Sequence, residues 1–344
     1  MVRIRFPAAL ILGVLSVLTA STAGGQEPTS KPLEFRRNEG MRRVYFAIYL
    51  IDIDSISAEQ QNFQVNVVVR LRWKDERLAH ERPEARTMPL TDVWEGYLMV
   101  TGQQPHFRRA MPEDVDVEPD GTVIYRQQWS GPLSQPMDLA DFPVDAQDFN
   151  IHFVASGYRP GEIEFVPDII PGAEDIPGGG LAKEISLPDW RVLSVTPEAR
   201  ALTFAAGRKI PGFALTFVAK RHFAYYLYNV FVPLVLITMM SWVPFFVDPA
   251  RAEVQIGVAS STVLTLIAQR LVVSNILPRL PYLTRMDYVL LVATVLVFAA
   301  FVQVSATSVL AYRNHHDIAV KLDRVSRVVF PIALFTTIAL SLLL

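Results

Sequence analysis

Apolar and polar residues alternate along two stretches in the first half of the chain. Between residues 43 and 53, Val44, Phe46, Ile48 and Leu50 fall on one face, and between residues 62 and 73, Phe63, Val65, Val67, Val69 and Leu71 do so. Successive side chains of a strand point to opposite faces, so this spacing of two predicts strands with one buried face.

Turn signals separate these strands from further short ones. Asp120-Gly121 lies between residues 115–118 and 122–127, and this dipeptide favours a tight hairpin. Residues 149–153 and 213–219 also have strand patterns, with Pro and Gly clustered between the strands. Many short strands with such spacing predict an all-β, immunoglobulin-like sandwich.

After Arg221 the pattern changes to long uncharged segments, at residues 223–247, 254–269, 288–312 and 328–344. A helix needs about 20 apolar residues to cross a bilayer. We therefore predict a multi-domain membrane protein, in which the N-terminal sandwich is followed by a four-helix transmembrane bundle. The spans are predicted at about 223–247, 253–276, 286–312 and 325–344. A buried soluble bundle is the alternative, but its helices would still need a polar stripe.

The first residues have the pattern of an export signal. Arg3 and Arg5 precede an apolar run at 6–18, and small residues follow at 20–23. We predict a signal peptide over 1–23, a periplasmic domain over 24–221 and a transmembrane domain over 222–344. A retained membrane anchor is the alternative for the first segment. Basic residues are more frequent at 313–327 than at 278–287, which gives the same orientation for a multi-pass protein of the bacterial inner (plasma) membrane.

The composition excludes several classes of partner and site. The formal net charge of −2 gives no indication of a nucleic-acid partner. The absence of cysteine excludes a zinc–cysteine site, a disulfide framework and a cysteine nucleophile. The chain has no Gly-rich phosphate loop, no Gly-x-Ser-x-Gly elbow and no His-Glu-x-x-His, so we predict no enzymatic activity, no cofactor and no metal. The acidic stretch at 113–120 is interpreted as solvated surface, with a divalent-cation site as the alternative.

The second predicted span has a stripe of residues at steps of three or four. These residues are Glu253, Gly257, Ser261, Leu264, Ala268, Leu271 or Val272, and Asn275. The spacing places them on one face of a helix. The first part of the stripe is charged, small or hydroxylic and the later part is apolar, which indicates a wettable pore mouth followed by a constriction that closes by dewetting.

One such helix cannot enclose a pore, so the stripe predicts a ring-shaped homo-oligomer. Copies of Glu253 would then form an acidic ring, and negative rings favour cations. The alternative is that Glu253 is only a helix-start residue that interacts with the helix dipole.

Several motifs occur together in one order. They are residues 73–78 (Trp-Lys-Asp-Glu-Arg-Leu), residues 137–147, Pro233 with Ser241-Trp242, residues 261–265, residues 277–282 and residues 324–331. In this order they resemble the pentameric ligand-gated ion channel family, which includes bacterial members and the animal Cys-loop receptors. Gln135 and Phe149 replace the two cysteines of the named loop, as is common in bacterial members.

The resemblance implies a homopentamer with an agonist pocket between adjacent sandwich domains. A cation–π cage in this pocket would use Trp94 or Tyr97, Tyr158 and Phe204, although Ser156 stands where the family has a key aromatic residue. An arginine that matches Arg70 holds an agonist carboxylate in some amino-acid-gated relatives. The alternative is that Arg70 is merely solvated.

The resemblance also implies coupling residues between the two domains. The family pairs the charges that match Asp145 and Arg221, and Asp52 or Asp54 are candidates to join them. Pro281 and Tyr282 would receive the movement. The alternative is an ordinary surface ion pair.

The predicted function is a ligand-gated channel. Its expected partners are the lipid bilayer, permeating monovalent cations and a small-molecule or ionic agonist, with protons, amines, amino acids and divalent ions all left open. An anion channel of the same fold and a non-conducting periplasmic sensor are the alternative functions.

Overall fold

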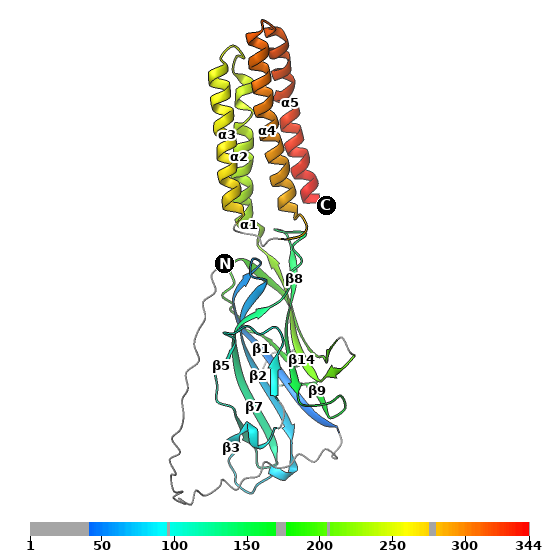
Figure 1. The fold of residues 1–344 in the computed structure, drawn as a ribbon. Helices are drawn as coiled ribbons and strands as arrows, with labels where there is room; N and C mark the ends of the chain where they lie inside the picture. Colours follow the sequence, from blue (N-terminus) through cyan, green and yellow to red (C-terminus); the bar gives the residue numbers. More distant parts are fainter. Residues whose placement is uncertain (1–40, 95–96, 170–176, 205–206, 275–279, 344) are drawn as a thin grey trace, which may run out of the picture. The chain divides into compact units, whose positions relative to one another are not determined.

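The computed structural model describes residues 41–94, 97–169, 177–204, 207–274 and 280–343. All of its strands lie between Arg42 and Arg221, and the long helices lie between Phe223 and Leu343 (Figure 1). The predicted signal peptide, residues 1–23, and the stripe residue Asn275 lie outside the described residues.

The larger sheet contains eight of the described strands, in the order β10-β1-β2-β7-β6-β3, with β9 beside β1 and β5 beside β7. Their bounds are β1 Arg42–Ser57, β2 Asn62–Lys74, β3 Arg86–Pro89, β5 Arg108–Arg109, β6 Asp114–Val117, β7 Thr122–Ser134, β9 Ile163–Pro167 and β10 Gly179–Leu181. Short 3-10 helices lie at Glu76–Leu78 and Leu90–Asp92. The predicted hairpin is confirmed, since Val117 pairs with Val123 across the turn and Gly121 has a φ of +82°.

The smaller sheet has the order β11-β14-β8-β4. Its strands are β4 Tyr97–Val100, β8 Ala146–Ser156, β11 Trp190–Ala199 and β14 Gly212–Arg221, and a separate hairpin is formed by β12 Leu202–Thr203 and β13 Lys209–Ile210.

Aromatic rings from the two sheets meet in a common core. The Phe46 and Phe213 ring centroids are 4.8 Å apart, and those of Phe63 and Phe149 are 5.0 Å apart. The alternating apolar residues of β1 and β2 that the sequence placed on one face are at most 2% exposed. The predicted sandwich is therefore confirmed.

The helical region begins one residue after β14. It consists of α1 (Phe223–Tyr226), a π-helical segment (Leu227–Phe231), α2 (Val232–Met240), a 3-10 segment (Val243–Phe246), α3 (Ala252–Val273), α4 (Arg285–Tyr312) and α5 (His316–Leu343). α4 packs against both α3 and α5, as Figure 1 shows.

Among the described residues, three helical segments are long and apolar enough to cross a membrane: Phe223–Phe246, Ala252–Val273 and Arg285–Tyr312. They correspond to the first three predicted spans. α5 contains the apolar residues of the fourth predicted span, but its first turns carry Asp317, Lys321 and Asp323. The fourth span, 325–344, stays a prediction.

Candidate functional site

Asp145 and Arg221 form a buried ion pair where the sandwich meets the first helix. Asp145 directly precedes β8 and Arg221 ends β14, and these two strands are neighbours. The Nε and Nη2 atoms of Arg221 lie 2.8 Å from Oδ1 and 3.2 Å from Oδ2 of Asp145. The two side chains are 4% and 1% exposed. The predicted pair is therefore present, and it is not an ordinary surface ion pair.

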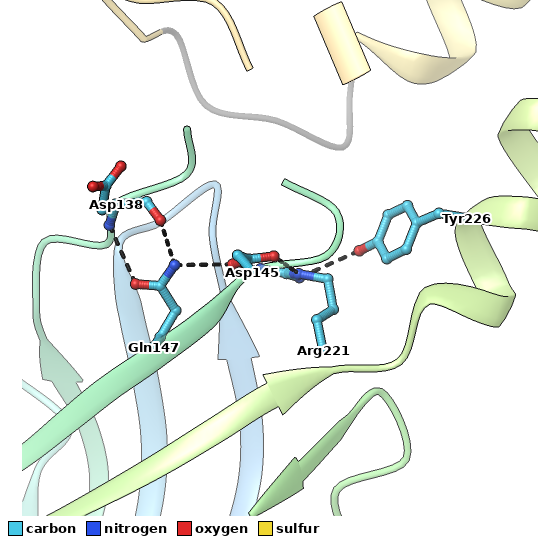
Figure 2. Close-up of polar contacts among 5 residues, drawn as sticks. All are labelled: Asp138, Asp145, Gln147, Arg221 and Tyr226. Atoms are coloured by element: carbon cyan, nitrogen blue, oxygen red, sulfur yellow. Dashed lines mark hydrogen bonds and ion pairs between the residues drawn. The ribbon is translucent and has the colours of Figure 1, made fainter. Parts of the chain in front are cut away.

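Three further polar groups extend this pair into a network (Figure 2). Gln147 Nε2 donates to Asp145 Oδ2 at 2.9 Å and also to the carbonyl of Asp138. The amide nitrogen of Asp138 in turn donates to Gln147 Oε1 at 3.2 Å. On the other side, Arg221 Nη1 donates to the Tyr226 hydroxyl at 3.3 Å. The network thus joins the loop before β8, the end of β14 and helix α1.

Aromatic rings enclose the guanidinium group of Arg221. Its Cζ atom lies 4.0 Å from the ring centroid of Trp190, 4.7 Å from that of Phe142 and 5.8 Å from that of Tyr226. Rings at such distances attract a cation through their quadrupoles. Removal of one partner from a buried pair leaves an unpaired charge and costs about 3–5 kcal/mol. We therefore expect Asp145 and Arg221 to stay paired in the folded chain.

The loop before β8 also contacts the start of α4. The amide nitrogens of Arg285 and Met286 donate to the carbonyls of Ala140 and Phe142 at 3.0 and 3.2 Å. The amide nitrogen of Leu139 donates to the Tyr282 hydroxyl at 3.1 Å. The predicted receiving residue Tyr282 is 40% exposed, but its hydroxyl contacts the sandwich. Its neighbour Pro281 is also exposed.

An ion pair between Arg285 and Asp141, at 2.7 Å, reinforces this contact. Sequence reasoning missed this pair, as it missed the junction residues Gln147 and Trp190. One local signal was available: Thr284 and Asp287 form a capping box that fixes where α4 begins.

Asp52 and Asp54 do not join the Arg221 pair. Asp52 Oδ1 accepts hydrogen bonds from the amide nitrogens of Ser186 at 2.7 Å and Ile53 at 2.8 Å. The bond from Ser186 is the main reason that the pKa of Asp52 is below its usual value. Asp54 is exposed where the register of β1 shifts, and it forms no ion pair with Arg221 in the part of the chain that the structure describes. Coupling through Asp54 therefore has no contact to support it.

The predicted stripe lies on the exposed face of α3. Its six described members, Glu253, Gly257, Ser261, Leu264, Ala268 and Leu271, are all exposed in the single chain. Leu264 and Leu271 are 69% and 65% exposed.

The opposite face of α3 packs against the other helices. Its buried residues are Gln255, Ala259, Thr262, Leu266 and Val273. At about 100° per residue, the centre of this buried face lies roughly half a turn from the stripe. The fold therefore leaves free the face of α3 that sequence periodicity assigned to a pore.

Comparison with known proteins decides the family. The sequence model of the neurotransmitter-gated ion-channel ligand binding domain matches residues 23–174, and that of the neurotransmitter-gated ion-channel transmembrane region matches residues 230–317. The chain belongs to this ion-channel family, whose bacterial members are pentameric ligand-gated channels. A protein named "Proton-gated ion channel" from Gloeobacter violaceus is 26% identical over 296 residues, which cover 84% of this chain and 79% of that protein.

Family membership makes the chain a ligand-gated ion channel and a multi-pass membrane protein, and not an enzyme. The channel-family assignment agrees with the order of motifs in the sequence.

The four aromatic candidates for the agonist pocket have different environments. Trp94 and Tyr158 are 5% and 7% exposed, with ring centroids 5.1 Å apart in the sandwich core. Apolar rings at inward positions are most stable in such a core, so these two rings contribute packing. Tyr97 and Phe204 are 73% and 49% exposed, and they stay candidates for ligand contact.

Arg70 has a partner within its own chain. Its Nη1 donates to Asp168 Oδ2 at 2.8 Å, and Arg72 Nη2 donates to Asp168 Oδ1 at 2.5 Å. Asp168 is 3% exposed. Its bond to Arg72 is the main reason that the pKa of Arg72 is above its usual value. Arg70 is therefore not merely solvated, and an agonist carboxylate would compete with Asp168 for it.

In the acidic stretch, no three histidine or carboxylate side chains among the described residues come together as metal ligands would. Asp116 is paired with Arg126 at 2.7 Å, Asp120 is 3.3 Å from Lys74 Nζ, and Glu113 is paired with Arg109. Neighbouring cations already neutralise these carboxylates, which supports the interpretation as surface.

Proposed function

We propose that this chain is a subunit of a homopentameric, cation-selective channel whose pore is lined by α3. The single observation that carries the proposal is the exposed stripe on α3, opposite to its buried face. A lipid-facing stripe with a carboxylate, a glycine and a hydroxyl would be unfavourable, because polar groups in hydrocarbon are costly. Five copies around an axis would give this stripe a water-filled surrounding.

The order of residues along the stripe suggests how the pore works. Glu253 in the first turn of α3 would form an acidic ring at one mouth, which attracts monovalent cations. Leu264, Ala268 and Leu271 would form the apolar constriction that blocks ions when it dewets. Asn275 is the predicted continuation of this stripe.

Orientation and location follow from the sequence. A cleaved signal peptide would place the sandwich in the periplasm, and four spans would hold the protein in the bacterial inner membrane. Arg313 after α4, and Lys321, Arg324 and Arg327 in the first part of α5, would then face the cytoplasm, in agreement with the positive-inside tendency.

Agonist binding would reach the pore through the junction described above. A pocket between adjacent sandwich domains could combine Tyr97 and Phe204 of one subunit with Arg70 of the next. A shift of the loop 138–145 would act on α1 through Arg221 and on α4 through Tyr282 and Arg285.

Protons are a specific candidate agonist. The relative from Gloeobacter violaceus is named proton-gated, and His152 of this chain is a titratable group near the hairpin of the predicted pocket. The Nε2–H of His152 donates to the carbonyl of Arg200 at 2.8 Å. Burial lowers the pKa of His152 below its ordinary value, so a fall in pH would charge a buried ring beside the β12–β13 hairpin.

The test is current recording from purified protein in planar bilayers, with a salt gradient and a step from pH 7.5 to lower values. We expect proton-evoked currents that reverse near the cation equilibrium potential. Glu253→Gln should move the reversal potential toward zero, whereas Asp317→Asn, an exposed acid in the first turn of α5, should not. An unchanged reversal potential in Glu253→Gln would reject the acidic ring, reversal near the anion potential would favour an anion channel, and no current under any agonist would favour a sensor.

A further inference from the structure

Buried polar side chains from three helices meet at the end of the helical region where α3 begins. Gln255 of α3 and Thr307 of α4 are 0% exposed, Ser308 of α4 is 6% exposed and Asp323 of α5 is 1% exposed. None of these residues belongs to the junction or to the exposed stripe. Polar groups are expensive to bury unless they are hydrogen-bonded, so the partners of each one are informative.

Gln255 fixes the first turn of α3 to its surroundings. Its Nε2 donates to the carbonyls of Pro244 and Val247, both at 2.9 Å. Its Oε1 lies 3.3 Å from Ser308 Oγ, but the single proton of that hydroxyl is shared with the Val304 carbonyl at 2.8 Å, so this bond is weak. Gln255 follows Glu253 by two residues, so the two side chains point to nearly opposite sides of the helix. A bond that holds Gln255 inward therefore holds Glu253 outward.

Asp323 is the one member of this cluster with no hydrogen-bond partner among the described residues. Both of its carboxyl oxygens are buried without a partner, although Gln255, Gln303 and Thr307 lie around the group. The nearby cation, Arg327, is directed elsewhere. Its Nε donates to the carbonyl of Phe245 at 3.0 Å, and its guanidinium group lies over the Phe246 ring.

A neutral, protonated carboxyl group would remove the cost of burying Asp323 as an unpaired charge. In that state Asp323 has one O–H donor. The amide oxygen of Gln255 can accept a second hydrogen bond besides the weak one from Ser308. A short adjustment of side chains would then link α5 directly to the first turn of α3.

We propose that Asp323 is a positioning residue for the ion path, which acts through Gln255 to keep Glu253 directed at the pore axis. This inference rests on the proposed function of α3 and names the contact that sets its selectivity. Because the link needs a donor and not a charge, asparagine should replace Asp323 and leucine should not.

The test measures reversal potentials of Asp323→Leu, Asp323→Asn and the exposed control Asp317→Leu. We expect Asp323→Leu to lower the cation-to-anion permeability ratio by about threefold, while the other two variants retain the wild-type ratio. Gln255→Leu should give the same reduction, and the double variant Gln255→Leu with Asp323→Leu should give no further reduction. A merely structural role would reduce the yield of assembled protein without moving the ratio.

Three results would overturn the inference: a wild-type ratio in Asp323→Leu, an equal loss in Asp323→Asn, or additive losses in the double variant. Amide hydrogen exchange of residues 252–258 in purified protein supplies a readout that needs no current. Exchange there should accelerate in Asp323→Leu and not in Asp323→Asn, and unchanged exchange in Asp323→Leu also contradicts the inference. If Glu253→Gln leaves selectivity unchanged, the acidic ring has failed, and exchange alone decides whether Asp323 holds the start of α3.

Discussion

The β-sandwich and helix α3 bury their apolar residues in different ways. In β2 every second residue points into the core, and Val65, Val67 and Val69 are 0% exposed. In α3, Leu264 and Leu271 are 69% and 65% exposed. The apolar face of one sheet packs against the other sheet of the same chain, whereas large apolar side chains of the helix stay exposed. Exposed apolar patches mark surfaces that need a partner or lipid.

The comparison distinguishes regions whose contacts are complete within one chain from a region whose surface lacks contacts in the single chain. The sandwich core and the Asp145–Arg221 junction have their partners within the chain. The free face of α3 has none among the described residues, and in our proposal its apolar residues meet their copies from the other subunits at the constriction of the pore. We therefore expect core substitutions to change stability, stripe substitutions to change gating, and substitutions at the junction to change both.

The largest effect is expected for Arg221→Ala. The variant leaves Asp145 buried without its cation, at a cost of about 3–5 kcal/mol, and it disconnects the sandwich from α1. We expect agonist-evoked current to be lost in bilayer recordings. Arg43→Ala, which removes an exposed pair with Glu164, is the matched control and should conduct normally. Normal gating in Arg221→Ala would remove the junction from the mechanism.

The second-largest effect is expected for one of two matched substitutions, one in the sandwich core and one in the α3 stripe. Phe213→Ala should destabilise the sandwich by about 3–5 kcal/mol, because Phe213 is 0% exposed and stacks on Phe46 and Phe153. Leu264→Ser should change the unfolding free energy by only about 0.5 kcal/mol, yet hydrate the constriction and favour the open state. Thermal unfolding and activation curves measure the two effects. Equal destabilisation by both would contradict the comparison.

A smaller effect is expected at His152, within the sandwich. Its folded-state pKa lies below the ordinary value of 6.5 because of burial, so the unfolded chain binds the proton first as pH falls. This contribution to stability is present above pH 6.5 and is lost as pH falls below it. Thermal unfolding between pH 7.5 and 5.5 should therefore be less pH-dependent in His152→Gln, which keeps a donor for the Arg200 carbonyl. If the unfolding temperature depends on pH equally in both proteins, His152 does not contribute to the pH dependence of stability.

The smallest effect is expected at the Arg285–Asp141 pair. Asp141 is 61% exposed and Arg285 is 26% exposed, so solvent screens the pair and it contributes about 0–1 kcal/mol. Asp141→Asn should shift the activation curve slightly and leave assembly intact, because the backbone bonds from Arg285 and Met286 remain. Complete loss of gating in this variant would show that the side-chain pair, and not the backbone contact, transmits movement.

Periodicity and short motifs determined much of this protein from sequence alone. The alternation at Phe63–Leu71 predicted a buried strand face, and the 3–4 spacing from Glu253 to Leu271 predicted the exposed face of α3. Both patterns depend on the geometry of one element, which neighbouring residues encode. The motif at 137–147 contributed to the resemblance to the channel family, and that resemblance implied the pairing of Asp145 with Arg221.

Apart from the Asp145–Arg221 pair, only the tertiary structure decided which distant groups meet. It gave Arg70 a partner in Asp168, 98 residues away, placed Trp94 and Tyr158 in the core, and enclosed Arg221 with Trp190. It also buried Asp323 without a hydrogen-bond partner among the described residues. The physical reason is that such contacts depend on how sheets and helices pack, and local hydrophobic patterns do not specify the partner across that interface.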